Sequence, residues 1–343
     1  MFAGRMHYVG CIFMTTLLAS VIIPVIMHWM WTSTGWLNKA TFIQNYVSYK
    51  DHGGGMLIHV CGGIVALIGS LFLGRRLFRL EDIDGGFLTP ESPASATVGY
   101  ILVIYGLMAV CLPTPVYEVT HEPMNYIGLI FINNILAAAG GIITVVVLQF
   151  FFSGNLLLQY WTMLRYMQGA VAGIVTIAPG VDVYTPYVAL GLGISGGILF
   201  YVIAYFMFYS ALEDYANIIA AHFSCGFLGS LLPPLCGSRE GFGVPHKIII
   251  HFGWQVIGGL VISVTMIVLT VLIFFLMKIL HLLRTEEDDI CHQRAMATLS
   301  RGPGRKCFER LWDLKPESFF LQPGCKAHKN TNKKGLDASE NKA

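Results

Sequence analysis

The sequence predicts an all-α membrane protein with about eight transmembrane helices. Of its 343 residues, 55% are hydrophobic and 12% are charged, whereas a soluble domain has about 45–50% apolar and about 25% charged residues. Because so few charges cannot cover a water-facing surface, the composition excludes a large soluble enzyme, a nucleic-acid binder and a disordered chain. The apolar stretches lack the alternation of barrel strands, and helices satisfy every backbone polar group within one segment in lipid.

Eight apolar segments approach the length of about 20 residues that crosses about 30 Å of hydrocarbon. The expected spans are residues 9–31, 54–73, 97–116, 124–152, 164–180, 184–208, 217–236 and 249–280. The first is too long for a signal peptide, so we expect it to be retained. The second, fourth, fifth and sixth contain glycine pairs or G-x3-G spacings, which let helices approach closely in lipid. The third is expected to end near Pro113 and Pro115, which break a helix.

The distribution of lysine and arginine predicts the orientation. Arg75, Arg76 and Arg79 follow the second span, and more than half of all lysines and arginines follow the eighth. With eight spans both places fall on the same side, which the positive-inside rule makes cytoplasmic. Both termini are then cytoplasmic, in what we expect to be the plasma membrane. The chain divides into a transmembrane domain, residues 1–284, and a largely disordered cytoplasmic tail, residues 285–343.

Two histidines lie inside predicted spans, where ionisable groups are expensive and usually face the bundle interior or a cavity. His59 lies in GGGMLIHVCGGIVAL and His222 lies in NIIAAHFSCGFLGSL. Each is followed by a glycine four residues later, Gly63 or Gly226, and by another small residue seven residues later. These positions share one helical face. Each histidine is therefore expected on a small-residue face that packs against another helix.

A polar residue precedes each histidine: Asp51 eight positions before His59, and Asn217 five positions before His222. By the span count the two helices run in opposite directions, as in inverted repeats whose matching elements meet at a midplane site. Two neutral imidazoles can share one hydrogen bond and leave a donor and an acceptor free, so the pair would line a single-file passage for small polar molecules. Because burial disfavours the charged imidazolium, a weak acid such as ammonium would cross as a neutral molecule and a separately relayed proton.

The two histidines are also compatible with another class of membrane protein. A membrane haem protein would use His59 and His222 as axial ligands. The eight cysteines contain no CxxC pair, so neither a disulfide framework nor a zinc site has support. We expect no metal and no cofactor, and no set of nucleophile, base and orienting group indicates an enzyme.

At these residues the sequence resembles the ammonium transporter/Rh family. Several motifs match in collinear order over about residues 3–290. They are His28-Trp-Met-Trp31 with Gly35-Trp-Leu37 (family H-W-x-W…G-W-L), Asp51 to His59 (D-x-A-G-G-x-x-V-H), Leu73-Gly-Arg-Arg76 (G-x-R), Phe131 to Asn134 (F-x-N-T), Gly169 to Pro179 (G-x-x-A-G-L-V-x-I-T-P) and Asn217 to Gly226 (D-x-x-x-x-H-x-x-x-G). The Asp-to-His spacing and the tail favour the ammonium-transporter branch over the Rh branch.

The resemblance implies eleven helices in two inverted halves, a homotrimer with one pore per subunit, and ammonium or ammonia as the substrate. If the roles of the matching family residues apply here, His59 and His222 line the pore. Asp51 and Trp31 recruit the substrate cation, the first by holding the outer site in shape and the second through its aromatic face. Asn133 is expected to be a structural polar group.

The sequence also departs from the family pattern. Its first residues align with the start of the family's fourth helix, so we expect the first three helices to be missing. Asn217 stands where the family has a second aspartate, as a structural polar group that can bond backbone but carries no charge. Ala109 and Pro113 stand near the positions of a gate aromatic and of a hydroxyl at the outer site. A non-conducting structural or regulatory subunit that assembles with full-length relatives is therefore the alternative function.

Overall fold

A computed structural model describes residues 2, 6–74, 93–112, 123–153, 160–210, 212, 214, 216–237 and 245–284. Within these residues the chain is mostly helical, and each of the eight predicted spans overlaps a helical segment. The predicted all-α membrane fold is confirmed at this level. The predicted cytoplasmic tail, the three arginines after the second span and the prolines after the third lie outside the described residues.

The elements follow the predicted spans in chain order. They are α1 (Tyr8–Leu17), η1 (Leu18–Ile22), α2 (Ile23–Trp31), β1 (Ala40–Phe42), β2 (Asn45–Val47), η2 (Gly55–Val60), α3 (Cys61–Leu73), α5 (Pro93–Val110), α6 (Pro123–Ser153), α7 (Tyr160–Ile177), η5 (Ala178–Gly180), α8 (Pro186–Tyr209), η6 (Ile219–Ser224), α9 (Cys225–Leu231), α10 (Pro233–Cys236) and α11 (Pro245–Ile279).

Proline sets the start of many of these helices. Five of them, α5, α6, α8, α10 and α11, begin at a proline. Proline suits the first helical position because its φ angle is already helical and its missing N–H would have no partner there. These starts therefore lie a few residues before or after the predicted ones, because hydropathy alone does not locate the first residue of a helix.

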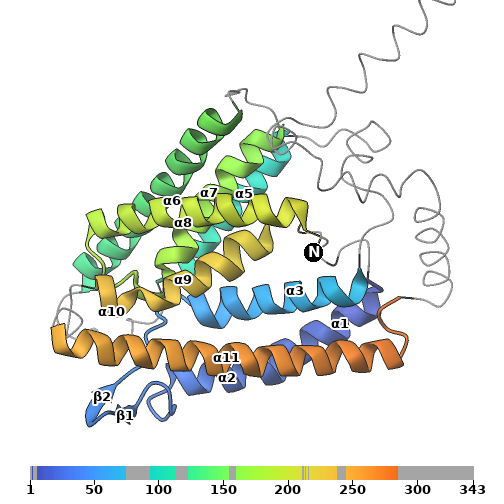
Figure 1. Ribbon diagram of the computed structural model, residues 1–343, viewed down its shortest axis with the longest axis horizontal. Helices are drawn as coiled ribbons and strands as arrows, with labels where there is room; N and C mark the ends of the chain where they lie inside the picture. Colours follow the sequence, from blue (N-terminus) through green and yellow to red (C-terminus); the bar gives the residue numbers. More distant parts are fainter. Residues whose placement is uncertain are drawn as a thin grey trace, which may run out of the picture.

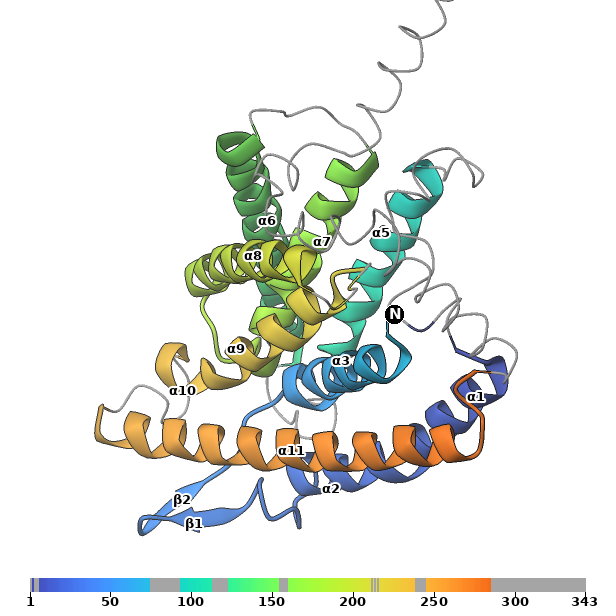
Figure 2. The ribbon, with the colours of Figure 1, turned by 45° about the vertical axis from the view of Figure 1, so that its right-hand side comes forward.

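The helices form two groups that meet at η2 and η6. Helices α5 to α8 pack together, and α11 packs along α3 beside α1 and α2. Figures 1 and 2 show α11 with α1 and α2 along the lower edge of the molecule, while α5, α6 and α7 rise away from it. The π-helical turns η2 and η6 contact each other, and each also contacts the helix that follows the other.

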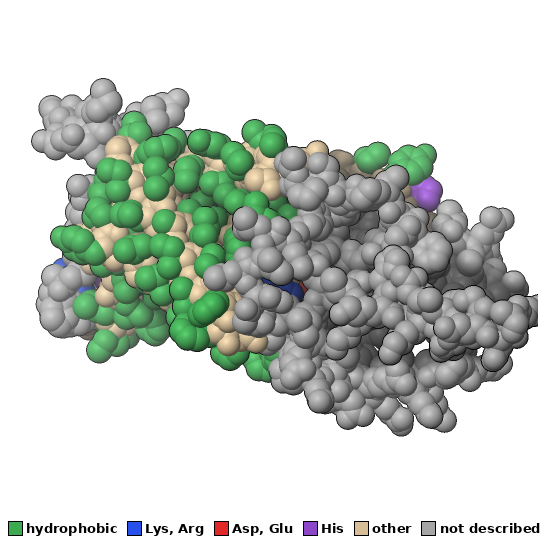
Figure 3. Space-filling model, turned by 90° about the horizontal axis from the view of Figure 1, so that it is seen from above, with side chains coloured by type: hydrophobic (Ala, Val, Ile, Leu, Met, Phe, Trp, Pro, Cys, Tyr) green, Lys and Arg blue, Asp and Glu red, His purple; other side chains and the backbone are tan. Residues whose placement is uncertain are grey.

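The surface of the described part suits lipid. Five helical segments are long and apolar enough to cross a membrane: Tyr8–Trp31, Gly55–Leu73, Ile127–Phe152, Pro186–Met207 and Lys247–Ile279. Two apolar helices are shorter, Ser95–Val110 and Ile219–Leu231. On the described surface visible in Figure 3, hydrophobic side chains dominate.

A small antiparallel hairpin is the one element of the described residues that the sequence did not predict. Its strands β1 and β2 pair Ala40 with Val47, Thr41 with Tyr46 and Phe42 with Asn45. The hairpin lies between α2 and the segment that leads to η2.

Glycine brings α6 and α7 into backbone contact. A Cβ atom on Gly141 would lie 2.0 Å from the carbonyl oxygen of Gly169, and one on Gly173 would lie 2.1 Å from the carbonyl oxygen of Ala137. Real Cβ atoms do not come so close to backbone, so only glycine fits at these two positions. The predicted close approach through small residues is confirmed for this helix pair.

Candidate functional site

The two predicted histidines lie side by side at the junction of the helix groups. The Nδ1 atoms of His59 and His222 are 3.1 Å apart, and the two rings stack with centroids 5.1 Å apart at an interplanar angle of 29°. At this distance one nitrogen donates a hydrogen bond and the other accepts it, so both imidazoles can be neutral. Each ring then keeps its Nε2 atom for another partner.

The glycine four residues after each histidine makes this contact possible. A Cβ atom on Gly63 would lie 2.5 Å from the Cβ atom of Phe223, the neighbour of His222. A Cβ atom on Gly226 would lie 2.8 Å from the carbonyl oxygen of Gly55 and 3.1 Å from the Cβ atom of His59. Each small-residue face therefore packs against the element that carries the other histidine. The sequence predicted only that each face would pack against another helix.

Each histidine lies in a π-helical turn whose first backbone N–H groups are capped by the carboxylate of an aspartate. The carboxylate of Asp51 accepts hydrogen bonds from the backbone N–H groups of Met56, at 3.2 Å, and Leu57, at 3.0 Å. The carboxylate of Asp214 accepts them from Ile218 and Ile219, both at 2.7 Å. A carboxylate at a helix start satisfies N–H groups that have no partner within the helix and is favoured by the helix dipole.

A second aspartate caps the turn that carries His222. Asp214 precedes His222 by eight residues, which is also the spacing of Asp51 to His59. The family motif pairs the histidine with the residue five positions before it, which is Asn217. Asn217 instead adopts a left-handed backbone conformation, with φ 51°, and its Nδ2 atom donates to Oε1 of Gln168 at 2.8 Å. The signal that would have found Asp214 is the repeated eight-residue spacing.

The remaining predicted residues take well-defined positions. The indole Nε1 atom of Trp31 donates to the backbone carbonyl of Asp51 at 2.7 Å, so the ring is held against the segment that leads to η2. The side-chain Nδ2 atom of Asn133 donates to the carbonyl oxygens of Val181 and Tyr184, both at 2.9 Å. Asn133 thereby fixes the turn between η5 and α8. Cation recruitment by Trp31 and Asp51 stays a prediction.

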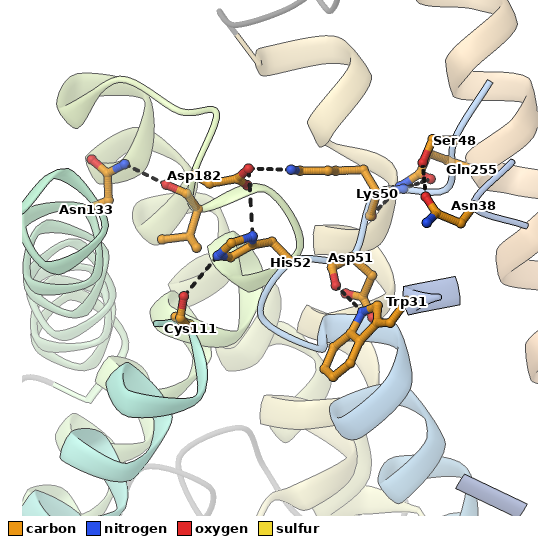
Figure 4. A network of polar contacts seen from close by, with 11 residues as sticks. Trp31, Asn38, Ser48, Lys50, Asp51, His52, Cys111, Asn133, Asp182 and Gln255 are labelled. Carbon is orange, nitrogen blue, oxygen red and sulfur yellow. Dashed lines mark hydrogen bonds and ion pairs between the residues drawn. The ribbon is translucent and has the colours of Figure 1, made fainter. Parts of the chain in front are cut away.

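A charged network beside Asp51 was not anticipated from the sequence (Figure 4). Lys50 forms an ion pair with the carboxylate of Asp182, and the Nδ1 atom of His52 lies 3.8 Å from the same Oδ2 atom. The Nε2 atom of His52 donates to the carbonyl oxygen of Cys111 at 3.0 Å. Burial lowers the pKa of His52, against the opposing effect of the Asp182 charge. The network joins the segment before η2 to Cys111, the residue that follows α5, and to the turn before α8.

The side chain of Gln255 holds the backbone of this segment. Its Oε1 atom accepts from the N–H of Lys50, and its Nε2 atom donates to the carbonyl oxygen of Lys50, both at 2.8 Å. The same Nε2 atom donates to the carbonyl oxygen of Ser230 at 2.7 Å. Lys50 is therefore fixed through its backbone by α11 and independently bound through its side chain to Asp182.

The histidine geometry disfavours haem ligation. Axial ligands lie on opposite faces of a porphyrin, and two hydrogen-bonded, stacked imidazoles leave no room for a macrocycle between them. Within the described ranges, no three His, Cys, Asp or Glu side chains gather as a metal site.

The burial of Asp51 gives a testable pH dependence. Burial raises the pKa of Asp51 from 3.8 to about 6, although the N–H groups of Leu57 and Met56 oppose the rise. Because the folded protein then binds this proton at pH values where the unfolded chain has lost it, the unfolding free energy falls as pH rises from about 4 to about 6. The expected fall is roughly 3 kcal/mol. Thermal unfolding of the wild type and of Asp51→Asn across this range measures it, because the variant lacks this contribution. Parallel pH profiles of the two proteins would contradict the assignment.

Comparison with known protein families gives a clear match. The model of a family described as "Ammonium Transporter Family" matches residues 1–296. A putative ammonium transporter 1 from Caenorhabditis elegans is 23% identical over 305 residues, which cover 83% of this chain and 56% of the relative. Ammonium transporter 1 from Schizosaccharomyces pombe is 26% identical over 241 residues, which cover 68% of this chain and 42% of the relative. The chain thus spans about half the length of these curated relatives.

Solved structures share the fold. The crystal structure of Candida albicans Mep2 matches with a TM-score of 0.66 at 22% identity, over 84% of this chain and 62% of that one. A structure titled "Sensor Amt Protein" matches with a TM-score of 0.67 at 22% identity, over 83% of this chain and 68% of that one. The family match and the long apolar helices together support an integral membrane protein.

Proposed function

The chain belongs to the ammonium transporter family, and from this premise we propose that it moves ammonium or ammonia across a membrane through a passage lined by His59 and His222. The observation that carries the proposal is the 3.1 Å contact between the Nδ1 atoms of the two imidazoles. It lies where the π-helical turns η2 and η6 meet. Two matched acidic caps and two matched glycines position this contact. Such duplication of one arrangement is typical of inverted-repeat transporters with a central site.

The chemistry of the pair suits a small weak acid. A chain of two neutral imidazoles offers one N–H donor and one bare nitrogen at its ends, so it can accept a proton at one end and release one at the other. An isolated cation in an apolar passage would carry a large desolvation penalty, whereas neutral ammonia would not. Asp51 and Trp31 would act before the histidines, where a cation first loses water.

Uptake measurements test the proposal. Cells without ammonium transporters of their own are expected to take up radiolabelled methylammonium in a saturable manner when they produce this protein. His59→Ala and His222→Ala are each expected to lower uptake at least about tenfold, because either change removes one half of the donor–acceptor chain along the passage, and about 1.4 kcal/mol added to the barrier is a factor of ten in rate. His28→Ala, which changes an exposed histidine, serves as the control. Absence of uptake by correctly inserted wild-type protein would refute the activity.

The assembly and its placement belong to the same proposal. We place the chain in the plasma membrane as a homotrimer, or as a hetero-oligomer with longer relatives, with both termini in the cytoplasm. Residues 1–284 would form the membrane domain and residues 285–343 the cytoplasmic tail. Native mass spectrometry of the detergent-purified protein and protease access from each side of sealed vesicles test these points.

A non-conducting subunit is the second candidate. What favours it is that polar groups near the expected outer site are already bound within the chain: Trp31 to Asp51, and Lys50 to Asp182. A subunit of this kind would co-purify with a full-length ammonium transporter from the same cell. A stable homotrimer that conducts by itself would exclude it.

A further inference from the structure

The carboxylate of Asp182 has an unusual environment for a buried charge (Figure 4). Asp182 is 5% exposed, and its Oδ2 atom is paired with the ammonium group of Lys50. Its Oδ1 atom is buried and has no hydrogen-bond partner. A buried carboxylate needs both a counter-charge and donors for its remaining lone pairs, so this side chain has capacity for a further N–H donor.

The group that occupies this carboxylate is a primary ammonium. The ammonium of lysine is a compact point charge with three N–H donors, the same head group as in methylammonium and close to ammonium itself. The Lys50 side chain keeps 24% exposure. Because Gln255 holds only the backbone of Lys50, the side chain can leave Asp182 without unfolding the segment.

The local charge also favours an external cation at Asp182 in place of the Lys50 ammonium group. Asp51 and Asp182 contribute two carboxylates, while Lys50 contributes one positive charge that acts on both. An opposite charge within a few ångströms is worth more where water is partly excluded.

We propose that Asp182 is a binding site for a primary ammonium group, that Lys50 is its built-in occupant, and that a small ammonium cation competes with Lys50 for it. The proposal rests on the proposed function only for the choice of ligand. Because Lys50 is tethered beside its partner, its effective concentration is about millimolar or higher. An external cation therefore displaces it only at comparable concentration, and removal of Lys50 exposes the full affinity of Asp182.

Chemical rescue of Lys50→Ala tests this competition. The substitution removes the three carbons and the nitrogen beyond Cβ, which n-propylammonium restores. We expect n-propylammonium and methylammonium chloride to raise the thermal unfolding midpoint of the purified variant at concentrations at least tenfold lower than the wild type requires. Tetramethylammonium, which has no N–H, and sodium at equal ionic strength are expected to give no such rise.

Matched variants locate the effect. The double variant Lys50→Ala, Asp182→Asn is expected to lose the response, and Lys39→Ala, at an exposed lysine, is expected to behave as the wild type. If Lys50→Ala does not fold, Lys50→Met keeps the apolar stem, and calorimetric titration with methylammonium replaces the unfolding assay. A response no stronger than in the wild type, or one that persists after Asp182→Asn, would overturn the proposal.

The readout separates this site from the transport activity. Binding to the detergent-purified protein requires no passage across a membrane, so it is expected to persist in a His59→Ala, His222→Ala background that also carries Lys50→Ala. Loss of uptake with retained binding would contradict the proposed function alone. Normal uptake without cation rescue would contradict the Asp182 site alone.

Discussion

Replacing Gly193 with leucine is expected to prevent α6 and α8 from packing. A Cβ atom at this position would lie 2.4 Å from the carbonyl oxygen of Ala137 and 2.6 Å from its Cα atom. Both are backbone atoms, and the same carbonyl also faces Gly173 on α7, so Ala137 has no direction in which to yield. We expect a loss beyond the about 1–3 kcal/mol of ordinary overpacking. Size-exclusion profiles and the thermal unfolding midpoint in detergent measure it.

The control lies two residues away on the same helix. A Cβ atom on Gly191 would meet no heavy atom within 4 Å, and leucine is a better helix former than glycine. Gly191→Leu is therefore expected to stay monodisperse, with an unfolding midpoint at or above that of the wild type. If Gly193→Leu gave the same profile as Gly191→Leu, close backbone packing of α6 and α8 would be refuted.

The spans were predictable because lipid imposes one simple requirement. A segment of about 20 apolar residues in a membrane forms a helix, and this holds whatever its neighbours do. The helix ends depend on local chemistry that hydropathy ignores. Proline at the first position moved the start of α5 to Pro93 and that of α8 to Pro186, away from the predicted residues 97 and 184. The sequence did contain this signal.

The hairpin was unpredictable for a local reason. Its two turn residues, Ile43 and Gln44, both have positive φ angles, of 47° and 60°. Tight hairpin turns of this kind strongly prefer Asn-Gly or a similar pair, and a β-branched isoleucine is unusual there. The side chain of Asn45 donates to the carbonyl oxygen of Ile43 at 2.7 Å, which supports the turn. The sequence around these residues therefore carried no standard hairpin signal.

The candidate site divides in a similar way. The histidine pair was predictable because one pattern, a histidine followed four residues later by glycine, occurs in two helices. The pair formed by Lys50 and Asp182 joins residues 132 positions apart. Its existence depends on how η5 and the segment before η2 approach each other, which no local pattern reports. Asp214 falls between these cases. Its spacing of eight residues to His222 is visible in the sequence, but the family motif draws attention to Asn217, five residues before His222.

Replacing Asp214 with alanine is expected to lower both stability and transport. The substitution leaves the N–H groups of Ile218 and Ile219 without their acceptor. A hydrogen bond to a charged group is worth about 1.5–3 kcal/mol, so we expect a loss of about 2–4 kcal/mol after the carboxylate's own desolvation is discounted. Because His222 lies three residues beyond Ile219 in the same π-helical turn, its contact with His59 is expected to loosen. Methylammonium uptake should fall as far as in His222→Ala.

Asn217→Gly tests whether Asp214 or Asn217 is the residue that supports the turn carrying His222. Glycine accepts the left-handed conformation of this residue, so the variant removes the hydrogen bond to Gln168 and leaves the Asp214 cap intact. Its effect on unfolding and uptake is expected to be smaller than that of Asp214→Ala. Asp214→Asn, which keeps a side-chain oxygen as acceptor, should lie between them. If Asn217→Gly were the more damaging change, Asn217 would be the true counterpart of Asp51, and the two histidine turns would not share one capping arrangement.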